Sequence, residues 1–233
     1  MKFNTIHSLG SRCQNSEILK FYGFREFAGF FDFMNTHKVS TIKHILSDDF
    51  NEILKDENNV SLDCYQTTVE PETGILLPHS VRTSNKYYNE NYNNSDESIF
   101  PHHDLNSEKD KEHFLKCKNR FKKLINHNTL FNYTYNIWEN NITVEDMNEF
   151  VEILKNIHNF KNYKICFIGV KNSNHSNFEK IISTEFFDSW LLTINNSFSG
   201  GLFNKTIDNE NYISIIKTYD IDENRVSKEE IDY

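Results

Sequence analysis

The chain lacks several features that mark secreted, membrane-spanning and nucleic-acid-binding proteins. Its 233 residues include only four cysteines, with no CxxC pair and no signal-like apolar stretch at the N-terminus. We therefore expect reduced thiols in an unsecreted, cytoplasmic protein rather than a disulfide framework. No apolar run approaches the about 18 residues of a spanning helix, so we expect no membrane partner. The net charge of −9 argues against nucleic acid as a partner, because binding phosphates requires clustered Lys and Arg.

Glycine and proline are also scarce. Seven Gly and three Pro argue against a turn-rich β-sandwich or barrel, whereas 20 Phe and 11 Tyr provide material for a core. The length suits one large domain, and we expect a single domain over residues 1–233. One basic stretch exists at residues 116–123, and we expect a helix to spread its charges around a solvated face.

Hydrophobic periodicity predicts strands that alternate with helices. We expect strands over residues 2–9, 129–135, 164–170, 187–194 and 211–219, and helices over residues 11–22, 38–55, 107–126, 144–159 and 177–186. Residues 58–98 predict two strands, 61–69 and 74–81, followed by a polar loop. The pattern indicates an α/β fold, a largely parallel central sheet with helices on both faces and an inserted segment around 58–98.

The first strand-to-helix turn carries the most reactive candidate residue, Cys13. Ligands in parallel sheets bind at the carboxyl ends of the strands, where this turn lies. Unpaired N–H groups at a helix N-terminus, together with the adjacent Arg12, are expected to lower the pKa of the thiol. The same N–H groups can stabilise an oxyanion. The alternative is a structural cysteine packed under the turn.

A thiolate nucleophile needs an imidazole to accept its proton, and the imidazole needs a partner that orients it. His102 and His103, followed by Asp104, are the candidates, and His79 is a weaker substitute. Adjacent histidines point in opposite directions, so only one can face Cys13. Asp32, among three phenylalanines, either faces solvent or is buried to orient a histidine or bind a hydroxyl.

Two other kinds of site use the same residues. A zinc site would draw on His79, His102, His103, Asp104 and Cys64, but HExxH and paired cysteines are missing, so we expect no metal and no cofactor. A phosphate cradle would use the turn residues Ser8, Gly10, Ser11 and Arg12, which we take as candidate ligand-binding residues. One glycine does not make a P-loop or a dinucleotide fingerprint.

Several of these motifs together resemble a known family. They are Ser8-Leu9-Gly10-x-x-Cys13, Phe31-Asp32-Phe33, Phe100-Pro101-His102-His103-Asp104, Asn119-Arg120-Phe121 and Leu130-Phe131. In this order they are similar to a family of bacterial and large-DNA-virus proteins labelled as papain-like cysteine peptidases, over residues of about 4–170. The resemblance implies a Cys–His hydrolase, with Cys13 as nucleophile and His102 or His103 as base. It also implies an alternative fold, the papain-like α+β fold with an antiparallel sheet.

Three functions are compatible with these observations. The first is a cysteine-dependent hydrolase or acyl-transfer enzyme, in which Asp32 or Asp104 orients the histidine and the substrate is a small molecule, a peptide or a glycan. The second is a glycosyltransferase-like or other nucleotide-sugar or phosphate-binding enzyme, in which Cys13 is structural. The third is a non-catalytic interaction protein. Selective alkylation of Cys13 is the expected signature of the first.

Overall fold

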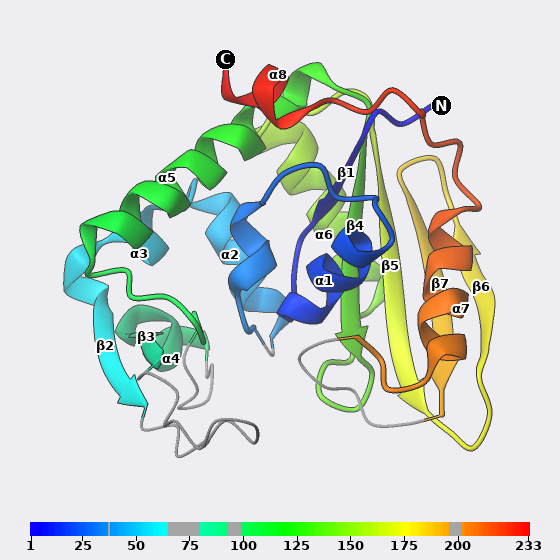
Figure 1. Ribbon diagram of the computed structural model, residues 1–233, viewed down its shortest axis with the longest axis horizontal. Helices are drawn as coiled ribbons and strands as arrows, with labels where there is room; N and C mark the ends of the chain where they lie inside the picture. Colours follow the sequence, from blue (N-terminus) through cyan, green and yellow to red (C-terminus); the bar gives the residue numbers. More distant parts are fainter. Residues whose placement is uncertain (37, 65–79, 93–98, 196–201) are drawn as a thin grey trace, which may run out of the picture.

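The computed structural model describes residues 1–36, 38–64, 80–92, 99–195 and 202–233, and its centre is a five-stranded sheet (Figure 1). The strands lie in the order β1-β4-β5-β7-β6. Their bounds are Thr5–Ser8 for β1, Thr129–Asn136 for β4, Tyr163–Asn172 for β5, Phe187–Ile194 for β7 and Asn177–Ser183 for β6. Strands β1, β4, β5 and β7 are parallel, and only the edge strand β6 is antiparallel.

This topology confirms the predicted α/β fold. It also shows that the papain-like α+β alternative is wrong for this chain, because a papain-like sheet is antiparallel. The pairing of β1 with β4 joins Thr5 to Thr129 in register, so everything between the two strands forms one long crossover connection. The turn that follows β1 therefore lies at the carboxyl edge of the sheet.

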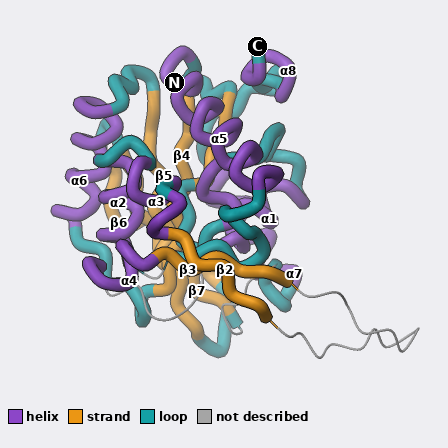
Figure 2. Tube along the Cα trace, turned by 90° about the vertical axis from the view of Figure 1, so that its left-hand side faces the viewer, coloured by secondary structure: helices purple, strands orange, loops and turns teal. Residues whose placement is uncertain are grey.

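Helices cover both faces of the sheet, as predicted (Figures 1 and 2). One face carries α1 and α7, and the other carries α2, α5 and α6. The bounds are Cys13–Phe21 for α1, Val39–Ser47 for α2, Asn51–Leu54 for α3, Lys86–Tyr92 for α4, Glu108–Lys123 for α5, Val144–Glu152 for α6, Thr206–Ile216 for α7 and Lys228–Asp232 for α8. Four short turns, η1 to η4, lie at Phe30–Phe33, Asp56–Asn58, Leu124–Asn126 and Ile153–Ile157.

Alternate side chains of the central strands belong to two separate hydrophobic cores, one on each face of the sheet. On β5, Ile165 and Phe167 join the aromatic-rich core beneath α2, α5 and α6, while Cys166 and Ile168 join the core beneath α1 and α7. A strand segment that is buried on both faces must be apolar along its whole length, which explains the continuous apolar run from 165 to 170.

The inserted segment forms a small second sheet and a helix that pack against the aromatic-rich core. Strands β2 (Asn59–Cys64) and β3 (Ser80–Asn85) pair antiparallel in a two-stranded sheet, and β3 leads directly into α4. The predicted strands 61–69 and 74–81 coincide only in part with these bounds, and residues 65–79 lie outside the described part of the chain. The predicted polar loop is wrong for residues 86–92, which are helical; the buried ring of Tyr88 anchors that helix.

Three other predicted elements are also wrong. The helix expected over 38–55 breaks at Asp49 and Phe50, whose φ angles of 56° and 64° are left-handed. The helix expected over 177–186 is the edge strand β6, whose mostly exposed residues carry little apolar periodicity. The strand expected over 211–219 belongs largely to α7, because burial of its isoleucines against the sheet outweighs their preference for strands.

Side-chain N-caps fix the starts of α6 and α5. Thr143 accepts a hydrogen bond from the backbone N–H of Asp146, and the Asp146 carboxylate accepts one from the N–H of Thr143. Ser107 caps α5 through the N–H of Asp110.

Among the residues that the structure describes, no helix has the length and apolar character needed to span a bilayer.

Gly29 allows an unusually close approach between η1 and β1. A Cβ atom placed on Gly29 would lie 2.3 Å from Cε1 of His7, although the φ angle of Gly29 is an ordinary −100°. The His7 ring is buried among Phe27, Phe121 and Phe131, so it has no room to retreat. Burial, with smaller effects of two nearby arginines, lowers the pKa of His7 to about 3, so the ring is neutral at physiological pH.

We expect Gly29→Ala to lower the free energy of unfolding by about 2–3 kcal/mol, because the new methyl group overpacks a rigid ring. Gly23→Ala is the matched control. Gly23 has a φ of +73° and no atom near its Cβ position, so alanine there meets backbone strain alone, about 1 kcal/mol. Urea denaturation followed by circular dichroism measures both. A Gly29→Ala cost no larger than that of Gly23→Ala would contradict the steric account.

Candidate functional site at the start of helix α1

The turn between β1 and α1 extends the hydrogen bonding of the sheet. The N–H of Leu9 donates to the Asn132 carbonyl at 2.8 Å, and the N–H of Ser11 donates to the Thr134 carbonyl at 3.2 Å. Gly10 between them has a φ of +98°, a conformation that favours glycine. The turn is thereby fixed against β4, and Cys13 follows as the first residue of α1.

A buried polar network holds this turn from below. The Asn15 side-chain amide donates to the Ser8 hydroxyl at 3.0 Å and contacts the carbonyls of Gly10 and Asn132 at 3.2 and 3.0 Å. The Tyr212 hydroxyl, from α7, contacts the side-chain oxygens of both Asn15 and Asn132. These groups are buried and bonded to one another, so they position the turn.

The four candidate ligand-binding residues of the turn are engaged within the protein. The N–H of Gly10 donates to the Ser8 hydroxyl at 3.2 Å, and the Ser11 hydroxyl donates to the Thr134 carbonyl at 2.8 Å. Arg12 forms an ion pair with Glu139 at 2.8 Å. A phosphate at this turn would have to displace these bonds, so the geometry does not favour the phosphate cradle.

Cys13 itself is half-buried at the first turn of α1. Burial raises the pKa of its thiol and Glu17 adds to the rise, whereas the backbone N–H groups of Cys13 and Gln14 and the charge of Arg12 lower it. Burial is the largest of these effects. The expectation that the helix terminus and Arg12 give a lowered pKa is therefore wrong for the resting protein: both act in the expected direction, but desolvation outweighs them.

Gln14 is the residue of this site that sequence reasoning missed. Its side chain is only 1% exposed, and neither its amide nitrogen nor its amide oxygen has a hydrogen-bond partner within the part of the chain that the structure describes. Burying an unpaired amide costs free energy, so such a group in a folded protein needs an explanation, and a catalytic role is one. Its place directly after the cysteine was the only signal in the sequence.

Asp32 lies in η1 and is buried, as one of the two alternatives predicted. Its carboxylate accepts hydrogen bonds from Arg25 at 2.9 Å and from the N–H of Gly29 at 2.8 Å. Burial raises the pKa of Asp32 to about 6 against the lowering effect of Arg25, so the carboxylate is ionised at neutral pH. The carbonyl oxygen of Asp32 also lies 3.0 Å from the Ser16 hydroxyl, which connects η1 to the first turn of α1.

The turn with His102, His103 and Asp104 follows a single bridge between Phe100 and Thr83 of β3. His102 is exposed, and burial of part of its ring lowers its pKa. Nδ1 of His103 lies 3.3 Å from the carboxylate of Asp110 in α5. Asp104 instead accepts a hydrogen bond from the Ser61 hydroxyl at 2.6 Å. The carboxylate that contacts His103 is therefore Asp110, which the sequence reasoning did not consider.

The start of α1 and the His103 turn both contact the segment around η1. The N–H of Thr36 donates to the Ser11 carbonyl at 2.7 Å, and the N–H of Asn35 donates to the Ile99 carbonyl at 2.9 Å. The ring of Phe33 packs edge-on against His103, with centroids 4.9 Å apart. Among the described residues, no hydrogen bond joins Cys13 to His102 or His103, so the η1 segment is what relates the two parts of the predicted site.

The residues that a zinc site would have used can be followed only in part, because His79 and the Cys64 side chain lie outside the described residues. Over the ranges that are described, no three His, Cys, Asp or Glu side chains lie close enough together to hold a metal ion.

Comparison with known protein families identifies the family of this chain. A family model described as "Putative papain-like cysteine peptidase (DUF1796)" matches residues 4–173, close to the span of the resemblance noted in the sequence. The chain belongs to this family. No curated protein matches it, and no solved structure matches it either. The family description supports a cysteine hydrolase in general terms.

The pH dependence of Cys13 alkylation tests the electrostatics of this site. Because burial raises the thiol pKa, less thiolate is present at pH 7 than on an ordinary cysteine. We expect the rate of iodoacetamide labelling at Cys13, followed by peptide mass mapping, to rise through a midpoint above that of an ordinary thiol, about 8.5. A midpoint below that value would show that the thiol is paired with a cation in solution. Cys117 and Cys166 are fully buried, so faster labelling of Cys13 than of these two reports exposure alone.

Proposed function

We propose that the protein is a cysteine-dependent hydrolase or acyl-transfer enzyme with Cys13 as its nucleophile. One observation carries the proposal: a half-buried thiol at the first turn of α1 is followed in the chain by a buried glutamine whose amide has no hydrogen-bond partner among the described residues. Membership of a family described as cysteine peptidases supports the same chemistry.

The start of α1 supplies donors for the negative charge that forms during acyl transfer. Attack of the sulfur on a carbonyl carbon converts the carbonyl oxygen into an oxyanion, which needs fixed hydrogen-bond donors. The N–H groups of Cys13 and Gln14 lie beside the sulfur, where they already stabilise its anionic form. The Gln14 side-chain amide is the third donor, and binding the oxyanion would satisfy its unpaired nitrogen.

His103 is the base that the geometry favours over His102. Its Nδ1 is next to the Asp110 carboxylate, so Nε2 is the nitrogen that can exchange a proton. In the proposed cycle Nε2 takes the proton of the Cys13 thiol as the sulfur–carbon bond forms. It returns this proton to the leaving group as the acyl–enzyme appears, and water releases the acid and restores the thiol. Catalytic hydrogen bonds commonly tighten only when substrate is bound.

Replacing Gln14 by methionine tests the oxyanion role. The two side chains are similar in length, so the change removes the amide and keeps the packing. With p-nitrophenyl acetate as an acyl donor, we expect Cys13 acetylation to fall about 100-fold, since each oxyanion donor contributes on this scale. Alkylation by iodoacetamide forms no oxyanion and should change less than about threefold. Equal losses in both reactions would show that Gln14 acts on the thiol or on folding and does not bind the oxyanion.

The base is tested by a pair of matched variants, His103→Gln and His102→Gln. We expect acetylation of Cys13 to fall about 100-fold in the first and to remain within about threefold of wild type in the second, because of the two histidines only the one that acts as general base contributes a factor of this size. Mass spectrometry of the Cys13 peptide gives the rate, and thermal melting confirms that both variants fold. Wild-type rates in both would contradict a Cys–His mechanism that uses this turn.

A further inference from the structure

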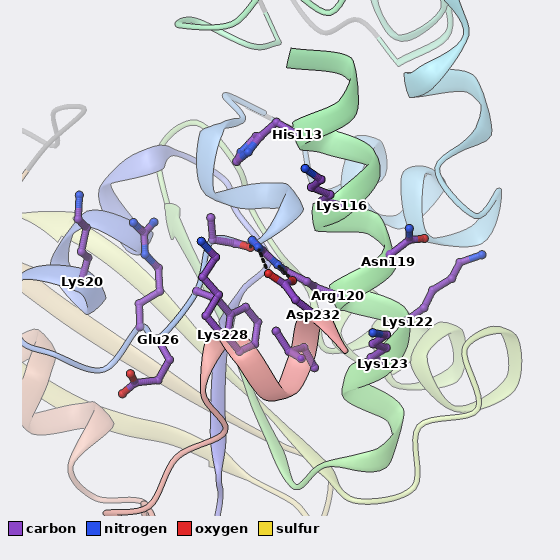
Figure 3. Close-up of a pocket in the computed structure, with 14 residues that line it drawn as sticks. Lys20, Glu26, His113, Lys116, Asn119, Arg120, Lys122, Lys123, Lys228 and Asp232 are labelled. Atoms are coloured by element: carbon purple, nitrogen blue, oxygen red, sulfur yellow. Dashed lines mark hydrogen bonds and ion pairs between the residues drawn. The ribbon is translucent and has the colours of Figure 1, made fainter. Parts of the chain in front are cut away.

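A large cavity lies apart from the Cys13 turn. Its volume is about 900 Å³, and it opens between α1, residues 25–28, the second half of α5 and α8 (Figure 3). Phe27, Ala28 and Ile231 form an apolar part of its lining. Cavities of this size accommodate small-molecule ligands.

The lining is strongly basic in a protein of net charge −9. It includes seven side chains that are cationic at neutral pH and only two carboxylates. The seven cations are Lys20, Arg25, Lys116, Arg120, Lys122, Lys123 and Lys228. Both carboxylates are already neutralised: Glu26 pairs with Arg225 at 2.7 Å, and Asp232 pairs with Arg120 at 2.6 Å.

Four of the lysines have no carboxylate partner within the described ranges. Arg25 pairs with Asp32, and Lys122 points away and pairs with Asp49. Lys20, Lys116, Lys123 and Lys228 form no ion pair with any described carboxylate and bring their charges to one cavity from α1, α5 and α8. In Figure 3, Lys20 stands on one wall and His113 and Lys116 stand on the facing wall.

The spacing along α5 explains why the charges gather. Lys116, Asn119, Arg120 and Lys123 follow one another at intervals that keep them on one face of the helix. The expectation that a helix would distribute the charges of residues 116–123 around a solvated surface therefore holds for Lys118 and Lys122, which pair with Asp49, but not for the residues on this face. That face looks onto α8 and residues 25–28, which close the cavity.

Concentrated like charges raise the free energy of the unliganded protein, and a bound anion would relieve the repulsion. We propose that this cavity binds a small molecule that carries two or more phosphate groups. The lysines supply point charges for the phosphates, the Asn119 amide supplies a polar contact, and the surface of Phe27 and Ile231 receives the apolar part of the ligand.

The distribution of charge argues for a compact ligand over a nucleic acid. A long polyanion needs a basic surface that extends along its backbone, whereas here the cations are confined to a hollow and the rest of the protein carries the excess of negative charge. The proposal is independent of Cys13, which does not line the cavity.

Isothermal titration with tripolyphosphate and with ATP, at about 0.15 M salt, tests the proposal on the full chain. The triple variant Lys116→Gln/Lys123→Gln/Lys228→Gln should bind about 30-fold more weakly than wild type, a factor of roughly three for each lysine. The matched control is Lys161→Gln/Lys171→Gln/Lys217→Gln, which changes the net charge equally at exposed positions outside the cavity. We expect its affinity to stay within about twofold of wild type.

Three outcomes would overturn the proposal. They are the absence of binding to both probes, equal weakening in the two triple variants, and equally tight binding of a single-stranded oligonucleotide or a poly-glutamate peptide. Lysine acetylation of the wild-type protein provides a second measurement that needs no variant. Tripolyphosphate should protect Lys20, Lys116, Lys123 and Lys228 but leave Lys161, Lys171 and Lys217 as reactive as before, and uniform reactivity would equally reject the site.

Discussion

The buried side chain of Asn15 is the interaction on which the arrangement around Cys13 depends. Its amide contacts Ser8 at the end of β1, the carbonyl of Gly10 in the turn and the carbonyl of Asn132 on β4. Its oxygen contacts the Tyr212 hydroxyl of α7. One side chain thus connects β1, the turn, β4 and α7. Because buried amides are costly when unpaired, any movement of the turn would leave several polar groups without partners.

The η1 segment connects the basic cavity, the start of α1 and the His103 turn. Asp32 holds Arg25, which lines the basic cavity, and its carbonyl contacts the Ser16 hydroxyl on α1. Phe33 contacts His103 on the other side. The cavity, the thiol and the imidazole therefore share one short structural element. The pKa of about 6 at Asp32 makes this element sensitive to mild acid, because a protonated Asp32 would leave Arg25 only its longer, 4.0 Å ion pair with Glu17.

The sequence predicts fold and site well where local pattern decides, as in the strand at 164–170 with its apolar run from 165 and in the place of Cys13 after a strand and a glycine. Predictions fail where distant segments decide. The isoleucines of α7 favour a strand locally but pack as a helix against the sheet. The sign of the pKa shift at Cys13 depends on desolvation by the folded chain. Asp110 and Gln14 were not predicted for the same reason. The contact of Asp110 with His103 and the burial of the unpaired Gln14 amide exist only in the folded chain.

The family model ends at residue 173, yet the fold of the matched part depends on the C-terminal residues beyond it. Strand β7 lies between β5 and β6, Tyr212 completes the contacts of Asn15 and Asn132, and Asp232 neutralises Arg120. A relative that exchanges this C-terminal part for another must also replace a buried hydroxyl and a counter-charge in the shared part. Substitutions on the surface of the last sixty residues are therefore less costly than changes to the two or three side chains through which these residues contact the part that the family model matches.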